Sequence, residues 1–542
     1  MESNTLVLAV ALVCTVAIAL SRWVCAIDPR EPPLVHNTIP VLGHIFGFIR
    51  YGQPYLIHLR YSTLSLTMIR ILTSANSAAH PDLPIFTVDL LLAKFYVVTS
   101  PALISGIQRN HRALSFEYVI NLSASGMLGV KGPGMDLLRE ESKGGGGLGL
   151  RVTHAMNPAL IGPGLDAMNE RMITYLKASV DQLADDPPAA VDLFAWTRHA
   201  ITVAATESVW GKQNPYRSRD LEDAFWTMET NLDTLLLRPL PRYTAPRVWR
   251  ARESLVAAFT AYYLADGLAS AASEMALARA REQRAAGATL ADTARLEAGL
   301  ALGLLSNTVP AAFWTLFELC SRPALLQDVR GELWREGAVS VDAETGVHTV
   351  DLAAIRDECG LLVAAFQETL RCRSKAMPVR MAYEDVVLGG GGGGEQYLLK
   401  KDAVVHMPSP AFHRNEGIWG AGSSAEAFDP RRFVKSVEKA EGGRRMAGFL
   451  AFGISPSLCP GRHFATGEVL ALVAMLVLRF DVVPEREGVW REPRVDAKSA
   501  AASFYTPVEE VRVVFKPRKE FEGVQWAYSV TPGKGRFGLI TG

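Results

Sequence analysis

The chain has 542 residues, of which 49% are apolar, and its 56 Lys and Arg residues balance 56 Asp and Glu residues. A formal net charge of zero argues against a nucleic-acid partner and against an acidic tail. A chain of this length ordinarily forms several domains, and its apolar fraction is ample for a large core.

The first 27 residues have the pattern of a membrane anchor. An apolar run covers Leu6–Leu20, and Trp23–Ile27 extends it to roughly the 20 residues that a spanning helix needs. A cleaved signal peptide is the alternative, but no Lys or Arg precedes the run and no convincing cleavage site follows it. Basic residues come after the run, at Arg22 and Arg30, which favours a cytosolic downstream domain. Residues 28–35 then form a stiff, proline-rich linker.

Cysteines and glycine runs carry little functional signal. The six cysteines lack the spacing of a disulfide framework, which is typical of a reducing compartment: Cys14, Cys25, Cys320, Cys359, Cys372 and Cys459. Two glycine runs, 144–147 and 389–394, are expected to be solvent loops, the second at the tip of a hairpin.

The body of the chain is predicted to be mainly α with small β-sheets. Apolar periodicity indicates helices over 294–319, from Pro323 onward, over 352–371, and from the region after Cys459 to about Leu478. Short strand-like pieces are expected at 379–387, 397–406 and in the alternating segment near the end of the chain.

The helix over 294–319 is expected to kink. Pro310 has no N–H, so the carbonyl of Ser306 loses its helical partner. That free carbonyl, the Thr308 hydroxyl and the Asn307 amide could together hold water. The alternative is an ordinary kink in which Thr308 bonds back to its own helix.

Cys459 is the most informative residue. A turn rich in Gly, Pro and Ser delivers its thiol to the start of a long helix, where the thiolate is favoured. A lone cysteine is more often a small buried apolar residue. Because no second Cys or His pair lies nearby, a closed zinc site is not expected. One thiolate, with a planar macrocycle supplying the other ligands, fits haem iron.

The cysteine segment resembles the cytochrome P-450 family. The family pattern Phe-x-x-Gly-x-(Arg/His)-x-Cys-x-Gly matches at Phe452, Cys459 and Gly461, whereas Ser455 and Ser457 depart from it. The resemblance implies the α-rich, triangular-prism P-450 fold as one catalytic domain over residues 36–542. It also implies haem b (iron-protoporphyrin IX) as the cofactor, bound near Phe452 and Gly461, with Cys459 as the axial iron ligand.

Two further motifs have the order and spacing of that family. Glu368 and Arg371 lie three apart on one helix face, a spacing that alone indicates only a surface salt bridge. Segment 428–433 resembles the family's Phe-x-Pro-x-Arg-Phe motif, which implies that Arg432 joins them in a buried triad that braces the cysteine loop. Arg380 is the candidate partner of a haem propionate, with a surface position on a strand as the alternative.

In the family, the helix over 294–319 crosses the haem and carries an acid–alcohol pair. Asn307–Thr308 matches this pair with an amide in place of the acid, and Leu304 and Leu305 stand where small residues are usual. The pattern Asn-Thr-x-Pro-Ala-x-Phe-Trp resembles the branch with sterol 7-alpha-hydroxylases and prostacyclin synthase, and fungal secondary-metabolism enzymes are similar here. The resemblance implies catalytic roles for Thr308 and for Asn307, which would orient water. His463 is expected to be a surface or packing residue rather than a second ligand.

The resemblance implies a monooxygenase of the endoplasmic-reticulum membrane that receives electrons from NADPH through cytochrome P-450 reductase. Basic segment 430–445 would face that acidic reductase, unless it is an ordinary charged loop with only Arg432 turned inward. Apolar segments from Leu114, at 225–264 and at 376–379 imply a lipophilic terpenoid, steroid-like or polyketide substrate, contacted by residues such as Phe116, Tyr118, Phe225, Trp226 and Met228.

Two other functions stay open at this point. One is a reductase-independent peroxide isomerase or dehydratase of the prostacyclin-synthase type, which the amide at Asn307 allows. The other is a non-catalytic membrane haem sensor. Turnover without any reductant separates the first from a monooxygenase, and an NADPH-dependent product would exclude the second.

Overall fold

The computed structural model describes residues 27–35, 42–51, 83–89, 93–139, 146–389, 395–434, 446–497, 502–533 and 536–539, together with Tyr55 and Leu59. The predicted membrane anchor therefore lies outside the described residues, apart from Ile27.

Helices dominate the described chain, and the predicted mainly α fold with small β-sheets is confirmed. The longer helices are α7 (Leu148–Met156), α8 (Gly162–Asp185), α9 (Leu193–Trp210), α10 (Arg219–Thr230), α13 (Pro246–Leu264), α14 (Glu274–Ala285), α15 (Leu290–Leu305), α16 (Thr308–Cys320), α17 (Pro323–Arg335), α19 (Gly360–Arg373) and α23 (Arg462–Arg479). Shorter helices include α2 (Leu42–Tyr51), α4 (Ile104–Arg109), α5 (Glu117–Leu122), α6 (Pro133–Arg139), α11 (Leu232–Leu237), α12 (Pro241–Thr244), α18 (Leu352–Glu358), α20 (Ser409–His413) and α21 (Glu416–Trp419).

The strands form small sheets at the margins of the helical part. The largest has five strands in the order β1 (Ile85–Asp89), β2 (Lys94–Val98), β10 (Val404–His406), β7 (Val379–Ala382) and β3 (Leu114–Ser115). One three-stranded sheet has the order β11 (Phe480–Pro484), β14 (Arg512–Pro517) and β4 (Val191–Asp192). A second has the order β15 (Trp526–Ser529), β6 (His348–Asp351) and β5 (Val339–Val341). Two strand pairs complete them: β8 (Val386–Gly389) with β9 (Gln396–Leu399), and β12 (Val495–Asp496) with β13 (Thr506–Pro507).

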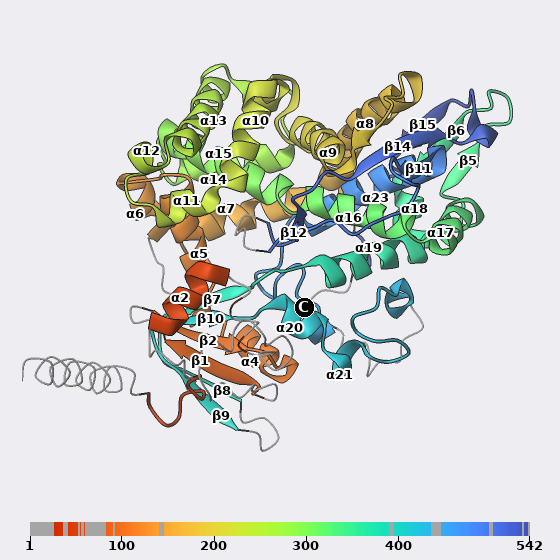
Figure 1. The fold of residues 1–542 in the computed structure, drawn as a ribbon. Coiled ribbons are helices and arrows are strands. Elements are labelled where there is room, and N and C mark those ends of the chain that lie inside the picture. Colours follow the sequence, from red (N-terminus) through yellow and green to blue (C-terminus); the bar gives the residue numbers. More distant parts are fainter. Residues whose placement is uncertain are drawn as a thin grey trace, which may run out of the picture.

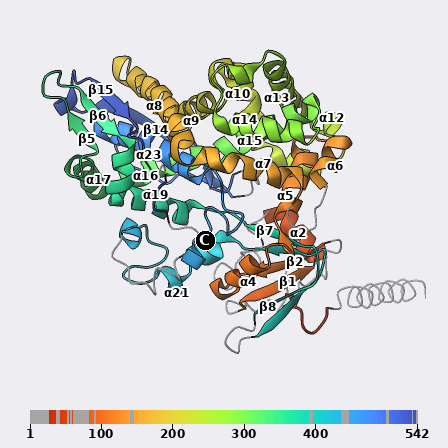
Figure 2. The same cartoon turned by 180° about the vertical axis from the view of Figure 1, so that it is seen from behind.

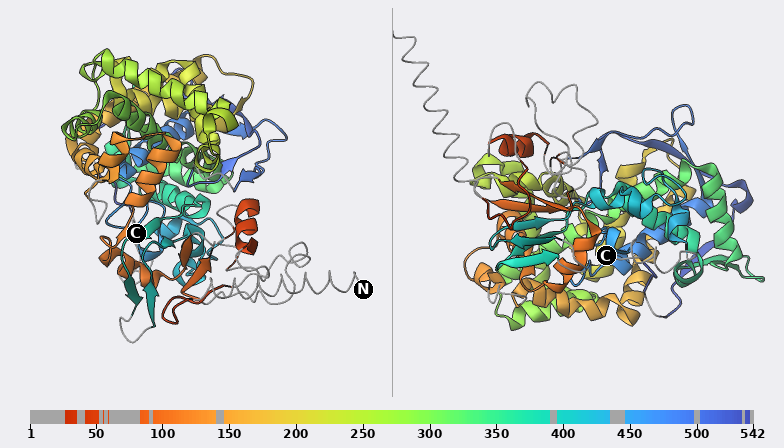
Figure 3. Two further views of the ribbon diagram at one scale, coloured as in Figure 1. Left: turned by 90° about the vertical axis from the view of Figure 1, so that its left-hand side faces the viewer. Right: turned by 90° about the horizontal axis from the view of Figure 1, so that it is seen from below.

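Two parts can be distinguished in Figure 1. Helices α7 to α16 and α23 gather in the upper part, the five-stranded sheet lies in the lower part, and α19 runs between them. The same division is visible from behind in Figure 2 and from the side in the left panel of Figure 3, whereas the view from below places the sheet in front of the helices. The segments that matter for function meet where these two parts adjoin.

The centre of the core consists of α16 and α23. Every residue of α16 is buried, and α23 is buried almost continuously from His463 to Leu478. A helix that is apolar on all sides requires an environment that is apolar on all sides, either a core or a membrane. In the described part of the chain, Leu290–Cys320 is long and apolar enough to cross a membrane, but most of it is buried within the protein. It is therefore a core segment.

The single helix predicted over 294–319 is in fact two helices. Ser306 and Asn307 separate α15 from α16, and the next helical bond runs from the Ala311 N–H to the Asn307 carbonyl. The break lies four residues before Pro310, where the missing N–H of proline leaves the Ser306 carbonyl without its partner.

The helix predicted over 352–371 is also interrupted, at Cys359. The carboxylate of Glu332 accepts hydrogen bonds from the N–H groups of Leu361 (2.6 Å) and Leu362 (2.9 Å). A side chain from α17 thereby caps the first turn of α19, which allows a new helix to begin there. The cap is a tertiary contact, so no local sequence signal announces it.

The predicted linker is attached to the five-stranded sheet. Leu34 forms a parallel bridge with Thr87, and the Val35 N–H donates to the Thr87 carbonyl (3.0 Å). Glu31 is buried and accepts hydrogen bonds from Lys94 and from the Tyr96 hydroxyl. The linker residues Glu31, Leu34 and Val35 are thus attached to the edge of the sheet by hydrogen bonds.

The expectation of solvent loops at the glycine runs is wrong for part of the first run. Gly147 is buried, and its N–H donates to the carboxylate of Glu117 (2.9 Å) as α7 begins. Around the second run, β8 and β9 form the expected hairpin with Gly389 opposite Gln396, and residues 390–394 lie outside the described part.

Acid is expected to destabilise this fold through its buried histidines. Burial lowers the pKa of His406 to about 4, that of His413 to about 3 and that of His463 to about 4. Between about pH 6.5 and pH 4 the unfolded chain binds protons that the folded chain does not, so stability falls as the pH falls.

We expect His406→Phe, which keeps an aromatic ring against Phe95, to lose about 2 kcal/mol less stability than the wild type between pH 7 and pH 5. Urea unfolding of both proteins at the two pH values measures this difference. Equal losses in the two proteins would show that His406 is not the titrating group.

Candidate functional site

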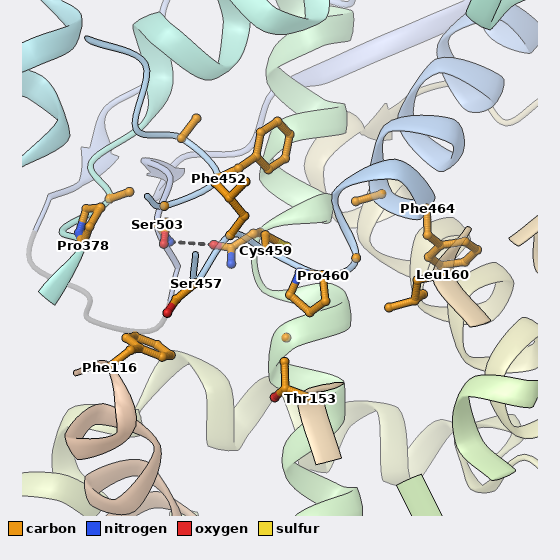
Figure 4. Close-up of a pocket in the computed structure, with 18 of the residues that line it drawn as sticks. Phe116, Thr153, Leu160, Pro378, Phe452, Ser457, Cys459, Pro460, Phe464 and Ser503 are labelled. Carbon is orange, nitrogen blue, oxygen red and sulfur yellow. Dashed lines mark hydrogen bonds between the residues drawn. The ribbon is translucent and has the colours of Figure 1, made fainter. Parts of the chain in front are cut away.

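A cavity of about 740 Å³ lies where the two parts of the fold meet. Its wall comes from distant segments of the chain: α5, α7, α15, α16, α19, β7, the loop 450–461, the start of α23 and the Ser503–Phe504 segment. In the view of Figure 4, Phe116 and Thr153 lie below the loop that carries Ser457, Cys459 and Pro460. Such a volume is typical of a site for a cofactor or small molecule.

Cys459 sits in this wall, at the end of a loop that backbone hydrogen bonds hold in place. Its N–H donates to the carbonyl of Phe452 (2.9 Å), and α23 begins three residues later with Gly461 as its N-cap. The loop turns at Gly453, whose φ of +83° is in the left-handed region that favours glycine. Phe452, Cys459 and Gly461 all line the cavity.

The electrostatics of the thiol differ from the sequence-based expectation. Burial raises the pKa of Cys459, although the N–H groups of Gly461 and Arg462 and the charge of Arg462 act in the opposite direction. The helix N-terminus alone therefore does not make this thiol a thiolate. A metal cation against the sulfur offsets the burial cost and deprotonates a coordinating thiol. The site fits a metal ligand better than a free nucleophile.

The loop rests on a buried cluster of charges. Glu368 and Arg371 form a two-pronged ion pair with both N···O distances at 2.7 Å, and neither side chain is exposed. The Nε atom of Arg432 lies 3.4 Å from the Glu368 carboxylate, and its side chain is 1% exposed. The structure thus brings Glu368, Arg371 and Arg432 together in the interior, not on the surface.

Backbone carbonyls satisfy the remaining donors of this cluster. Arg371 donates to the carbonyls of His413 (2.6 Å), Ala425 (2.6 Å) and Ala427 (2.9 Å). Arg432 donates to the carbonyls of Trp419, Ser423 and Ser424. The two guanidinium groups therefore tie α19 to the whole segment 413–427, and a buried ion pair is tolerable when its partners are complete in this way.

His413 connects the cluster to the cysteine loop, a link that the sequence did not reveal. One ring nitrogen is bonded to the carbonyl of Arg371 (3.1 Å), and the other accepts the N–H of Leu450 (2.9 Å), where the loop begins. The ring is fully buried and also stacks on Phe449. A histidine in the five-residue helix α20 carries no local pattern that could announce this contact.

Arg380 is a buried cavity residue, not a surface strand residue. It lies on β7 and is 3% exposed, and its guanidinium donates to the carbonyls of Val379 (2.8 Å) and Ile454 (3.2 Å). No carboxylate in the described part of the chain pairs with it, and burial lowers its pKa to about 10. A buried cation without a counter-ion calls for an anion in the cavity.

Cys459 and Arg380 together provide a test of the implied cofactor. The buried Cys459 thiolate requires a cation beside it, and the buried Arg380 guanidinium requires an anion. Haem carries a cationic iron at its centre and carboxylates at its edge, so the residues present fit it.

Asn307 and Thr308 line the cavity, but both side chains are engaged with the protein. The side-chain amide oxygen of Asn307 accepts the N–H of Ser503 (2.7 Å), a bond drawn as the dashed line at Ser503 in Figure 4. The Thr308 hydroxyl donates to the carbonyl of Leu304 (2.9 Å), which is the back-bonded arrangement considered as the alternative. Leu304 lines the cavity, whereas Leu305 is buried in the core.

Only some of the residues predicted to contact the substrate line the cavity. Phe116 and residues 376–378 line the cavity, but Phe225, Trp226 and Met228 lie in the core around α10, and Tyr118 is not among the described lining residues. The wall includes residues that were not predicted: Leu150, Thr153, His154, Leu160, Ser503 and Phe504. Only the tertiary fold brings these segments to the cavity.

The remaining candidates have surface or packing positions. Arg431 is exposed and lies 3.3 Å from Asp328, Arg432 points inward as expected, and residues 435–445 of the basic segment lie outside the described part. His463 is buried, and its Nδ1 accepts the N–H of Phe537 (3.2 Å), so it packs rather than faces the cavity.

Comparison with known proteins gives one consistent result. The model of the family described as Cytochrome P450 matches residues 150–495. The chain is 39% identical to cytochrome P450 monooxygenase nodJ of Hypoxylon pulicicidum over 96% of both chains. It is 25% identical to a cytochrome P450 monooxygenase of Gibberella zeae, over 93% of this chain and 92% of that protein. It is also 25% identical to 7-alpha-hydroxycholest-4-en-3-one 12-alpha-hydroxylase of Oryctolagus cuniculus, over 90% and 93% of the respective chains.

Removal of the carboxylate from the buried cluster is expected to disrupt the site. Glu368→Ala leaves two buried guanidinium groups without their counter-ion, which costs about 3–5 kcal/mol. We expect little soluble protein and no bound haem, measured as yield and haem content after purification. The control Glu487→Ala breaks an exposed pair with Arg491 and should change neither. Normal haem incorporation in Glu368→Ala would contradict a bracing role.

Proposed function

This chain belongs to the cytochrome P-450 family of monooxygenases, and on that premise we propose that it oxidises an apolar small molecule with electrons from NADPH, delivered by a reductase. The observation that carries the proposal is the largely apolar cavity wall, which contains Cys459 and Arg380. Arg380 pairs with no carboxylate of the described residues.

Haem b, when bound, supplies an iron centre at which dioxygen is activated. In this chain Cys459 would hold the iron through its sulfur atom. The guanidinium group of Arg380 would bind a haem propionate, because its fork of N–H groups matches a carboxylate. Phe452 and Gly461 flank the sulfur in the wall. A Cβ added at Gly461 would meet no protein atom within 4 Å, so the space beside this residue is open.

The rest of the wall selects and positions the substrate. Phe116, Ile120, Leu300, Leu304, Met377 and Phe504 are apolar, so the cavity favours a lipophilic compound and excludes bulk water. Asn307 positions part of this wall, because its bond to the Ser503 N–H holds the segment that carries Phe504.

A terpenoid, steroid-like or polyketide compound of secondary metabolism is the substrate class that we infer. The support is the apolar wall and the likeness to fungal and sterol-hydroxylating relatives. The apolar run at Leu6–Leu20 supports attachment to the endoplasmic-reticulum membrane with the catalytic domain in the cytosol.

Exchange of the sulfur ligand tests the proposal directly. We expect wild-type protein to show a thiolate-type spectrum when reduced under carbon monoxide, and an NADPH-dependent product with a reductase. Cys459→Ser should lose both, with product falling to background, because serine does not provide the soft anionic ligand. Cys320→Ala, which removes a buried thiol outside the cavity wall, should keep both. Product formation without any reductant would instead indicate a peroxide isomerase.

Thr308 tests the oxygen side of the cavity. If its hydroxyl takes part in proton delivery, Thr308→Ala should form several-fold more peroxide per NADPH, whereas Thr308→Ser, which keeps the hydroxyl, should resemble the wild type. The ratio of peroxide to product, with NADPH consumption, measures this. An unchanged ratio in Thr308→Ala would show that the hydroxyl serves only its bond to the Leu304 carbonyl.

A further inference from the structure

A buried acid lies close to the break between α15 and α16. Glu229 is in the last turn of α10 and is 7% exposed. Burial raises its pKa to about 7, and the adjacent Ser306 hydroxyl acts in the opposite direction. A carboxyl group of this kind can hold or release a proton near neutral pH, which an ordinary surface glutamate does not do.

Ser306 is the first residue of the helix break and has unused hydrogen-bonding capacity. It is 2% exposed, and its hydroxyl has no hydrogen-bond partner among the described residues. It is close enough to Glu229 to influence the carboxyl pKa, but the two groups do not meet the geometry of a hydrogen bond. A small rotation or one water molecule can close this gap.

Ser306 connects this buried acid with the cavity wall. The next two residues, Asn307 and Thr308, line the cavity, whereas Ser306 does not. Its own carbonyl is left without a helical partner by Pro310 and can hold a water molecule at the break. Ser306 thus lies close enough to the buried acid to affect its pKa, and it directly precedes two residues of the cavity wall.

We propose that Glu229 is the proton source for oxygen reduction in this cavity, acting through Ser306 at the helix break. The proposal rests on the proposed monooxygenase function. Glu229 would supply the acidic proton that Asn307 does not provide. Asn307 is not an acid, and its side-chain oxygen is bonded to the Ser503 N–H.

The proton balance is simple. A monooxygenase converts a C–H compound, dioxygen, two electrons and two protons into an alcohol and water, and the electrons come from NADPH. The O–H bond of the Glu229 carboxyl breaks as the Ser306 hydroxyl accepts its proton and passes its own to water held at the Ser306 carbonyl. The Glu229 carboxylate then recovers a proton from solvent, so it is unchanged after each turnover.

The charges that face Glu229 suit this cycle. Lys375, between α19 and β7, and Arg198 of α9 lower the pKa of Glu229, and Asp496 of β12 raises it. Lys375 is buried, donates to the Asp496 carbonyl (3.2 Å), and is also influenced by Asp233 of α11. The two cations stabilise the carboxylate after it has donated its proton, and partly exposed Arg198 and Asp496 mark the side from which solvent can restore it.

The first test needs no turnover. Infrared spectra of the resting holoenzyme should show a protonated carboxyl band that disappears around pH 7 in the wild type and is absent in Glu229→Gln. Asp223→Asn, which removes an exposed carboxylate from the same helix, should leave the band unchanged. A Glu229 that is ionised throughout pH 5 to 8 would overturn the proposal.

The second test measures coupling with NADPH and a reductase. Product per NADPH should fall at least about tenfold in Glu229→Gln, with the lost electrons recovered as peroxide, and Ser306→Ala should show the same change. Wild-type coupling should decline above about pH 7, and Glu229→Gln should lose this pH dependence. Asp223→Asn should couple like the wild type. Wild-type coupling in Glu229→Gln at all pH values would overturn the proposal.

Failure of the proposed function is distinguishable from failure of this inference. Wild-type protein that shows a thiolate spectrum but no NADPH-dependent product would refute the monooxygenase proposal, and proton delivery with it. Wild-type protein that forms product while Glu229→Gln matches it refutes only the role of Glu229. Because glutamine is nearly isosteric and removes a costly buried acid, Glu229→Gln should remain folded with normal haem content.

Discussion

The buried ion pairing of Glu368 with Arg371 and Arg432 is the interaction on which the geometry of the site depends. Two fully enclosed guanidinium groups can share one carboxylate only if their remaining N–H groups find acceptors. Six backbone carbonyls between residues 413 and 427 provide them. These bonds fold an otherwise irregular segment against α19. Through His413 they also set the point at which the loop to Cys459 begins. A local helix motif thereby determines the position of a sulfur atom ninety residues later in the chain.

Two buried groups in the cavity wall lack partners of opposite charge among the described residues, and this indicates the charges that a ligand of the cavity carries. Burial disfavours the Cys459 thiolate at one point of the wall. At another point, Arg380 pairs with no carboxylate of the described residues. Each is a cost that the folded protein bears by itself. One ligand with a central cation and peripheral carboxylates removes both costs at once, so the binding of haem and the stability of this region should be coupled.

The break between α15 and α16 determines which polar groups lie near the part of the cavity wall that contains Asn307 and Thr308. Pro310 leaves the carbonyl four residues earlier without its helical partner, and Ser306, Asn307 and Thr308 at the break have three different environments. Ser306 is buried and close enough to Glu229 to affect its pKa, Asn307 holds the Ser503 segment, and Thr308 bonds to the preceding turn. A continuous helix without a proline at position 310 would hold all three residues to its regular spacing and would leave no free carbonyl at this point.

Local patterns in the sequence were sufficient for the mainly α fold, the position of the helix break, the turn before Cys459 and the pairing of Glu368 with Arg371, although not for the burial of that pair. Each of these depends on residues a few positions apart, where missing N–H groups, apolar periodicity and side-chain spacing act directly. The tertiary structure alone decided that Glu332 caps α19, that His413 links two loops, that α10 faces the core and that Glu229 lies beside Ser306. These contacts join residues that are distant in the chain, and burial and hydrogen-bond partners at such separations arise only when the whole chain has packed.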